Sequence, residues 1–397
     1  MSFVDAVDIP FLTLSDPSFS IRAPEVREAR ERSWYARTPY GIAILRYDDV
    51  GKLLRDLRLR QGSYAWPAHN NVTGKFADWW LRILLNRAGE DHARLRRLAS
   101  PAFSPKLILA PQFAGLANEI IDMFARRGHC EFMAEFSEPY VTRVVCLLLG
   151  LDHSEWRRLA DICADMGLAL GVTFKHDVEK INKATDALFE YAYRVIEERG
   201  AQPPIDDFLS QLLRANEDKD ALSDQELYDM VVLAVFGGID TTRNQLGLAM
   251  SLFVKHPDQW RLLTERPDLA KNAVEEVMRV RPTTTWITRE AMEDFTYRDL
   301  ELKRGTTLHL FSESAGTDPQ HFTPGFDIAA QRKPHFGFGG GVHHCLGHFI
   351  ARSDMTEALK VLAKRIRNPR YDGEPTWLPD SGNTGPIKLP IAFDPES

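Results

Sequence analysis

The sequence has few cysteines, only short apolar runs and no excess of positive charge. Its four cysteines form no CxxC pair and no close spacing, which argues against a disulfide-rich framework. Apolar runs such as residues 144–149 are far shorter than the ~18 residues that a membrane-spanning helix needs. The net charge of −7 argues against a nucleic-acid partner. We therefore expect a cytoplasmic protein that binds neither nucleic acid nor membrane.

The 397 residues, 44% of them apolar, are enough to bury a large core. Helical spacing of apolar residues dominates 90–280, and the capping-box spacing of Ser223 and Glu226 predicts one long helix over 223–255. Residues 41–47 read as a strand followed by a helix over 48–60, and short apolar runs after residue 280 indicate further strands. These patterns predict a mainly α fold with a smaller β region (α+β), organised as a single domain over residues 1–397. Its strands are expected mainly in 30–65 and 283–330, and its helices in 90–280 and 345–368.

The stretch HFGFGGGVHHCLGHFIAR, residues 335–352, holds the one cysteine with unusual neighbours, Cys345. A zinc site would need more cysteine or histidine at fixed offsets than the adjacent His343 and His344 provide. A nucleophilic thiol would find a general base in either histidine, but the glycines would stay unexplained. A thiolate ligand to haem iron accounts for the glycines, because residues without Cβ let a flat macrocycle approach the backbone. A glycine-rich loop around a buried structural cysteine is the remaining alternative.

This segment resembles the haem-binding signature of the cytochrome P450 superfamily. The match is carried by six residues: Phe338, Gly339, Gly341, His343, Cys345 and Gly347. The resemblance implies haem b as cofactor, with Cys345 as the axial ligand of the iron and with Phe338, His343 and Gly347 in the haem-binding segment. It also implies the family's fold, a triangular prism with a long central helix over the haem.

A polar cluster interrupts the apolar run of the predicted long helix. Gly237 and Gly238 precede Asp240 and Thr241, although each mid-helix glycine costs roughly 1 kcal/mol relative to alanine. A helix kink, or a neighbouring helix that satisfies the polar groups, would explain the cluster without any catalytic role. The stretch is similar to the family's oxygen-activation motif, which implies that Asp240 and Thr241 deliver protons in ordinary monooxygenation.

Glu276 and Arg279 are three residues apart on one predicted helix face, a spacing that solvated surface pairs also show. In context they resemble the family's ExxR motif, a structural pair that ties the core to the loop before the cysteine. Ala330 stands where bacterial members usually have an arginine, so Arg332 is expected either to replace it or to leave the network incomplete. Residues 316–317 are Gly-Thr in place of the family's polar pair, and we expect different packing there.

His92 and Arg96 lie four residues apart, as a pair that grips one anion would. The resemblance assigns them to the haem propionates, together with Arg289 and His343. It also implies a substrate pocket, whose aromatic and aliphatic character favours a lipophilic small molecule. One of its candidates, Trp79, is equally well explained as core. The pocket candidates are Trp66, Phe76, Trp79, Val235, Phe236, Gly238, Thr285, Trp286, Ile287 and Ile387.

The resemblance therefore implies a soluble bacterial monooxygenase that inserts one atom of O2 into a lipophilic substrate by hydroxylation, epoxidation or oxidative dealkylation. The sequence shows no flavin or iron–sulfur segment, so we expect electrons from a separate ferredoxin and its NAD(P)H-dependent reductase. Three alternatives stay open at this point. They are a haem-thiolate protein that binds ligands without turnover, a cysteine-nucleophile enzyme without haem, and an oxygenase whose substrate is tethered to a carrier protein.

Overall fold

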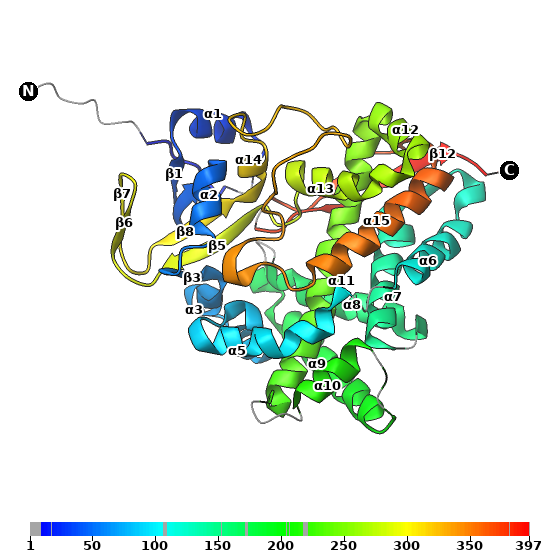
Figure 1. The fold of residues 1–397 in the computed structure, drawn as a ribbon, viewed down its shortest axis with the longest axis horizontal. Helices are drawn as coiled ribbons and strands as arrows, with labels where there is room; N and C mark the ends of the chain where they lie inside the picture. The colour runs from blue at the N-terminus through cyan, green and yellow to red at the C-terminus, as the bar shows by residue number, and fades with distance from the viewer. Residues whose placement is uncertain are drawn as a thin grey trace, which may run out of the picture.

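The computed structural model describes residues 9–16, 18–105, 109–151, 153–170, 174–203, 205, 207–216, 221–380 and 382–396. Figure 1 shows a strand-rich part on the left, built from the blue and yellow segments, and a larger helical part on the right. The helices are α1 (Pro24–Arg32), α2 (Tyr47–Leu53), α3 (Trp66–Asn70), α4 (Lys75–Arg82), α5 (Gly89–Ala99), α6 (Ala110–Asp122), α7 (Glu138–Leu149), α8 (Trp156–Gly167), α9 (Val178–Gly200), α10 (Phe208–Asn216), α11 (Asp224–Lys255), α12 (Pro257–Glu265), α13 (Ala270–Val280), α14 (Ser312–Gly316) and α15 (His348–Arg365).

The strands belong to four small sheets. The largest has the order β1-β2-β8-β5-β3, in which only β2 and β8 run parallel. A second sheet has the order β4-β12-β9, and the pairs β6-β7 and β10-β11 form hairpins. The strands are β1 (Tyr35–Thr38), β2 (Gly41–Ile44), β3 (Leu59–Gln61), β4 (His129–Glu131), β5 (Trp286–Ala291), β6 (Phe295–Tyr297), β7 (Leu300–Leu302), β8 (Thr307–Phe311), β9 (Arg367–Tyr371), β10 (Thr376–Trp377), β11 (Pro386–Lys388) and β12 (Pro390–Asp394).

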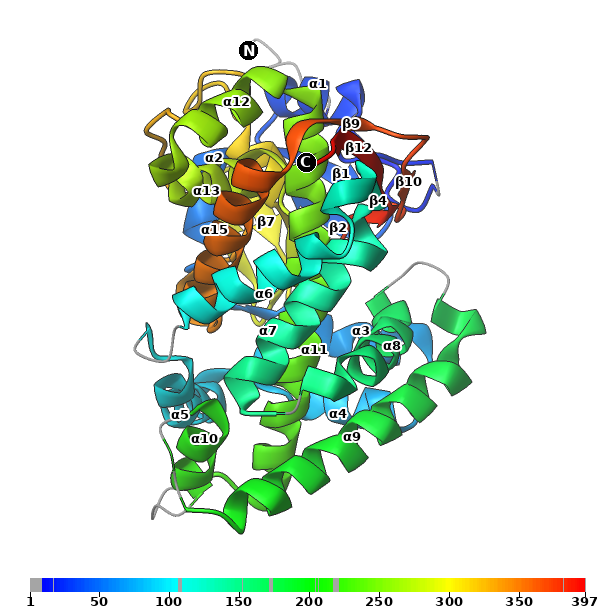
Figure 2. The ribbon, with the colours of Figure 1, turned by 90° about the vertical axis from the view of Figure 1, so that its right-hand side faces the viewer.

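The long helix α11 passes through the middle of the molecule in both views (Figures 1 and 2). The predicted capping box is present: the Glu226 amide donates to Ser223 Oγ, and the Ser223 amide donates to the Glu226 carboxylate at 2.9 Å. Its 32 residues contact α7, α8, α9, α13 and α15, so both halves of the helix are held by packing. The predicted mainly α fold with a central helix is confirmed.

The predicted boundaries near residue 47 are wrong. The strand ends at Ile44, and α2 begins at Tyr47, whose amide donates to the Asp318 carboxylate at 3.1 Å. A carboxylate 271 residues away in sequence therefore stabilises the start of this helix. The helix predicted over 48–60 ends at Leu53, and Leu59–Gln61 instead form β3, which pairs with β5.

Glu276 and Arg279 form a buried, doubly hydrogen-bonded ion pair on α13, with both N–O distances 2.7 Å. Arg279 also donates to the carbonyl oxygens of Gly316 (2.6 Å) and Gly325 (2.9 Å). Glu276 accepts the amide of Asp327 at 3.1 Å. The pair is therefore no surface contact: it fixes the segment that leads to the cysteine loop, as the ExxR resemblance implied.

The third member of this network is Arg332, whose Nη2 lies 3.5 Å from Glu276 Oε1. The network is therefore complete although position 330 is an alanine, because Arg332, two residues later, supplies the guanidinium. The departure at Gly316 also has a local reason. A Cβ on Gly316 would lie 2.3 Å from the carbonyl oxygen of Arg279, so no larger residue fits against α13 there.

None of the helices within these described ranges combines the length and the apolar character that crossing a bilayer requires.

We predict that Glu276→Gln lowers the free energy of unfolding by about 3–5 kcal/mol, because the buried Arg279 guanidinium loses its counter-charge. Arg332→Ala should cost less, since this contact is longer and the side chain is partly exposed. Urea unfolding followed by circular dichroism measures both. The matched control is Glu179→Gln, which breaks an exposed pair with Lys183 and should leave the midpoint unchanged. Equal effects of Glu276→Gln and Glu179→Gln would contradict the structural role.

Candidate functional site

The loop from His335 to Gly347 is a compact series of turns in front of α15. Backbone hydrogen bonds from Gly339 to Phe336 (2.8 Å) and from Cys345 to Phe338 (3.0 Å) hold it in shape. Gly341 has φ +66°, and a Cβ there would lie 2.3 Å from the carbonyl oxygen of Leu54. A side chain at this position would therefore be strained by its backbone conformation and would also collide with the end of α2.

Cys345 is the exposed cysteine of the loop, whereas Cys130, Cys146 and Cys163 are buried. Desolvation by the surrounding chain raises the pKa of the Cys345 thiol, while a hydrogen bond from the Gly347 amide and the positive charges of Arg96 and Arg352 lower it. These lowering contributions are the ones that favour a thiolate. The other three thiols lie in apolar packing, where burial raises the pKa of Cys130 and Cys163 strongly.

Arg352 and His335 connect the two ends of this loop to α13 through one carboxylate. Arg352 Nε lies 2.5 Å from Glu275 Oε1, and His335 Nε2 lies 3.1 Å from Glu275 Oε2. The Arg352 guanidinium also stacks 4.4 Å from the centre of the Phe338 ring. Burial would raise the pKa of Glu275, but His335 and Arg352 outweigh it and lower the pKa to about 2.

The four predicted anion-binding residues come together from α5, β5 and the loop. The rings of His92 and His343 are 4.2 Å apart, and Arg96 donates to the carbonyl oxygen of His344 at 2.7 Å. Arg289 is 2% exposed and donates to the Gln61 amide oxygen on the neighbouring strand. Desolvation, followed by the positive charges of His92, Arg289 and Arg96, lowers the pKa of His343 to about 3. Arg96 and Arg289 supply the positive charge of this cluster, and the two histidines, whose pKa values are lowered, add neutral hydrogen-bonding groups suited to an anion.

The middle of α11 is open on one side. Gly237 is exposed although its helix runs through the molecule, and a Cβ placed on it would meet nothing within 4 Å. Next to it, the Thr241 hydroxyl donates to the Gly237 carbonyl oxygen at 2.7 Å. Leu346, the residue after Cys345, packs against the hydrophobic cluster that contains Val235 and Phe236 of α11. Leu346 thus packs against the same apolar cluster that covers one face of α11.

Asp240 is held by two amide groups. Asn244 Nδ2 lies 3.3 Å from one carboxylate oxygen, and Asn383 Nδ2 lies 2.8 Å from the other. Desolvation raises the pKa of Asp240, and Arg243 and these two donors oppose the rise. Asn244 lies four residues after Asp240 on α11, so helical spacing places its side chain beside the carboxylate. Asn383 is 143 residues away from Asp240, and the sequence analysis did not identify it.

Comparison with known proteins gives three independent matches. The Cytochrome P450 family model matches residues 165–368. The chain is 38% identical to the luteothin monooxygenase of Streptomyces thioluteus over 97% of its length and 96% of the relative's. It is 30% identical to the mycinamicin IV hydroxylase/epoxidase of Micromonospora griseorubida, covering 97% and 98% of the two chains. This chain belongs to the cytochrome P450 family.

The fold of this P450 agrees with solved structures. It superposes on the cytochrome P450 CYP109Q5 from Chondromyces apiculatus with a TM-score of 0.87 at 25% identity, covering 98% and 100% of the two chains. The chain is thus a haem-dependent monooxygenase of a bacterial type, and the family's cofactor is a haem with a cysteine thiolate ligand. Of the other readings of the cysteine, the family excludes the zinc site and the haem-free thiol enzyme.

The residues present fit that cofactor. A haem carries two carboxylates, and the structure brings Arg96 and Arg289 together with His92 and His343. The ring lies against the backbone most easily where side chains are small, and Gly237 on α11 meets that need because a Cβ on it would meet nothing within 4 Å. Cys345 is accessible and receives an amide hydrogen bond and two nearby positive charges, which suits a thiolate ligand.

Some of the predicted substrate-pocket residues keep accessible surface in the structure, and others are buried. Trp66, Gly238 and Trp286 keep accessible surface, and Trp286 stacks on Phe311 at 5.5 Å. Ile387 lies on β11 and is 45% exposed, and its place in the pocket stays a prediction. The residues of this hairpin that reach α11 include Asn383, which bonds to Asp240, and Gly385 and Pro386, which lie against Asn244 and Gly247.

The remaining pocket candidates pack into the core. A side chain without accessible surface cannot contact a substrate unless its neighbours move, so the prediction is wrong for Phe76 and Trp79, which are 1% and 0% exposed. Trp79 packs edge-to-face on Phe236, and Phe76 stacks on Trp80, which makes them support for the site rather than its lining. The other buried candidates are Val235, Phe236, Thr285 and Ile287.

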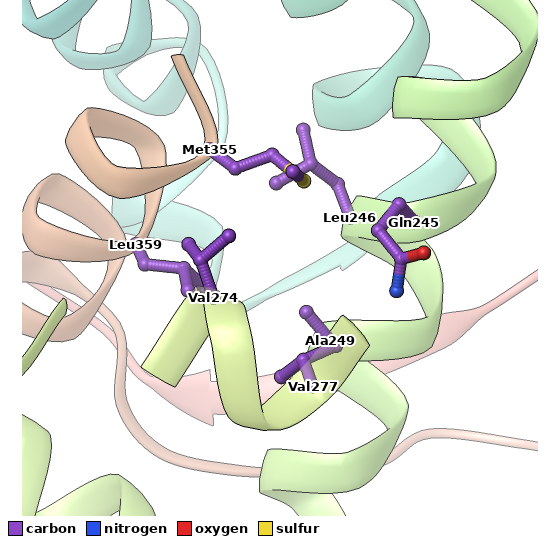
Figure 3. Close-up of a pocket in the computed structure, with 7 residues that line it drawn as sticks. All are labelled: Gln245, Leu246, Ala249, Val274, Val277, Met355 and Leu359. Atoms are coloured by element: carbon purple, nitrogen blue, oxygen red, sulfur yellow. The ribbon is translucent and has the colours of Figure 1, made fainter. Parts of the chain in front are cut away.

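Close packing continues between α11, α13 and α15. Figure 3 shows side chains of these helices, among them Leu246, Val277 and Met355, around an apolar void of about 10 Å³. Such a void is too small and too apolar to hold an ordered water molecule. It belongs to the packed core that supports α11, and it is no ligand pocket.

We predict that Glu275→Gln destabilises the protein by about 1 kcal/mol at pH 7, a value that allows for partial exposure of the pair. Because folding lowers the pKa of Glu275 from 4.5 to about 2, its stabilisation is complete above pH 4.5 and disappears as the pH falls towards 2. Urea midpoints of wild type and variant should therefore converge on acidification. A difference that stays constant with pH would contradict the ion-pair assignment.

Proposed function

We propose that this P450 oxygenates a lipophilic secondary metabolite, with Cys345 as the axial ligand of its haem iron. The single observation that carries the assignment is the surroundings of Cys345, an accessible thiol that receives the Gly347 amide and the positive charges of Arg96 and Arg352 at the end of a glycine-rich loop. The bound haem supplies activation of O2 at the iron, assisted by electron donation from the thiolate.

His92, Arg96, Arg289 and His343 hold the two carboxylates of the haem. Burial, followed by the charges of His92, Arg289 and Arg96, lowers the pKa of His343, and burial lowers the pKa of Arg289 to about 10. Each carboxylate relieves this cost by pairing with the buried cations. Binding of the cofactor is therefore coupled to the stability of the loop and of β5.

Thr241 and Asp240 move protons in the reaction. The Thr241 hydroxyl lies on the open face of α11 and releases its bond to the Gly237 carbonyl when it donates elsewhere. Asp240 is the adjacent acid, and desolvation raises its pKa while Arg243, Asn383 and Asn244 oppose that rise.

The substrate class follows from the accessible lining and from the relatives. Trp66 and Trp286 offer aromatic surface, and Gly238 keeps partial accessibility on α11. The relatives are named for luteothin and for mycinamicin IV, and the second is a hydroxylase/epoxidase. A luteothin-like metabolite is therefore the first substrate to test.

Electrons come from a separate ferredoxin and its NAD(P)H-dependent reductase. The cationic side chains around the loop are mostly engaged within the chain: Arg94 pairs with Glu226, Arg352 with Glu275, and Lys333 with His321. Docking of an acidic carrier would therefore draw on the summed field of this region rather than on isolated arginines.

The first experiment is the spectrum of the reduced, carbon-monoxide-bound holoenzyme. We expect the red-shifted Soret band that a thiolate trans to carbon monoxide produces, and its loss in Cys345→Ser. The control is Cys163→Ser, which alters a buried thiol and should keep the band. A histidine-type band in the wild type would contradict the ligand assignment.

The second part of that experiment supplies luteothin, ferredoxin and reductase under labelled O2. One labelled oxygen atom in the product would establish monooxygenation of this class of compound. A red-shifted Soret band without substrate binding or product formation from luteothin and related polyketide metabolites would contradict the proposed substrate class.

We predict that Thr241→Ala lowers product formation per NAD(P)H by about 10²-fold, because the positioned hydroxyl donor is lost. Binding of substrate, followed as a shift of the Soret band, should be unchanged. The matched control is Thr264→Ala, which removes a hydroxyl that makes the same i−4 bond, to Trp260 of α12, outside the site. Equal losses in both variants would refute a role of Thr241 in proton delivery.

A further inference from the structure

The turn between β10 and β11 is joined to the segment before β5. Thr284 and Asn383 form an antiparallel bridge, the Thr384 amide donates to the Thr283 carbonyl at 2.8 Å, and the Thr285 amide donates to the Gly382 carbonyl at 3.2 Å. Two chain segments about 100 residues apart therefore move as one unit beside the site.

The Asn383 side chain extends from this unit to α11. Its Nδ2 donates to Asp240 Oδ2 at 2.8 Å, and its Oδ1 accepts from the Thr283 hydroxyl at 2.8 Å. The carboxylate defines the orientation of the amide, since reversing it would place Asn383 Oδ1 against an ionised Asp240, whereas the Thr283 hydroxyl can pair with either end of the amide.

We propose that Asn383 is a positioning residue for Asp240: its amide donates to Asp240 Oδ2, which fixes the orientation of the carboxylate and favours the ionised form. The inference rests on the proposed function only in giving Asp240 a role in proton delivery. Asn383 touches neither the substrate nor the reacting atoms and acts through Asp240.

The network has a second arrangement in which every group is again paired. If Asp240 takes up a proton, it donates to Asn383 Oδ1, and the reversed amide donates to Thr283 Oγ1. The Thr283 hydroxyl then donates to the carbonyl oxygen of Thr384, which already lies 2.7 Å away. Reversal of one amide thus accompanies one change of protonation, at no loss of hydrogen bonds.

The same unit lies against a residue of the accessible lining. A Cβ on Gly382 would lie 3.3 Å from the indole Nε1 of Trp286, so the turn and this side chain are in contact distance. The other face of Trp286 stacks on Phe311, so this side chain holds the turn that carries Asn383 against β5 and β8.

The groups that face Asp240 are few within the described residues. Arg243 acts from the next turn of α11 and lowers the pKa of the carboxyl group, and Asn244 donates to it from the same helix. The buried Cys163 faces it from α8 as a thiol whose own pKa is raised. Asn383 is the donor from the hairpin. Removing it leaves Arg243 and Asn244 as the groups that favour the ionised form.

The test is an infrared titration of the Asp240 carboxyl group in the holoenzyme, identified by its absence in Asp240→Asn. We expect Asn383→Ala to raise the pKa of Asp240 by about one pH unit or more, because one hydrogen bond to the charged form is lost. Thr283→Val should shift it in the same direction, and Thr283→Ser should keep the wild-type value because the hydroxyl remains. The control is Asn216→Ala, which removes an exposed amide that bonds to Asp224.

An unchanged titration in folded Asn383→Ala, or equal shifts in Thr283→Ser and Thr283→Val, would overturn the proposal. If Asn383→Ala does not fold, the two Thr283 variants decide. This measurement needs no substrate, so a failure to oxygenate luteothin would count against the proposed function and leave this inference standing.

Discussion

The buried ion pair between Glu276 and Arg279 is the interaction on which the site depends. Taking two charges out of water is costly unless every donor and acceptor is used, and here backbone carbonyls of 316 and 325, the amide of Asp327 and the guanidinium of Arg332 complete the set. Because each of these groups comes from the chain between α14 and the cysteine loop, satisfying the pair also positions that chain.

The neighbouring residue, Glu275, attaches the cysteine loop itself to α13. Glu275 contacts His335 at its start and Arg352 just beyond its end, so both sides of Cys345 are attached to α13. Two adjacent acidic residues on one helix thus have different tasks. Glu276 satisfies the buried network, and Glu275, partly exposed, adjusts the electrostatics around the thiol through Arg352.

Positive charge is desolvated at one end of the site, although the protein as a whole is acidic. Arg96 and Arg289 are partly or fully buried beside His92 and His343, and an anionic partner offsets the cost of burying them. The opposite requirement holds at α11, where a single carboxylate, Asp240, is desolvated and depends on neutral amides and on Arg243. The two ends of the site therefore differ in what they bind. The cluster with Arg96 and Arg289 suits an anion, and Asp240 on α11 can take up a proton.

Local patterns in the sequence were enough to predict the cysteine loop, the capping box of α11 and the pairing of residues three or four apart, because each depends on backbone geometry within a few residues. They were not enough for contacts made across the fold. The start of α2 at Tyr47 depends on Asp318, the third arginine of the buried network is Arg332, and Asp240 is held by Asn383. Burial likewise distinguishes Trp79, which fills core, from Trp286, which keeps accessible surface. The sequence alone determined which chemistry the chain carries, and tertiary packing decided which residues surround it, since side-chain exposure and long-range hydrogen bonds exist only once the segments have come together.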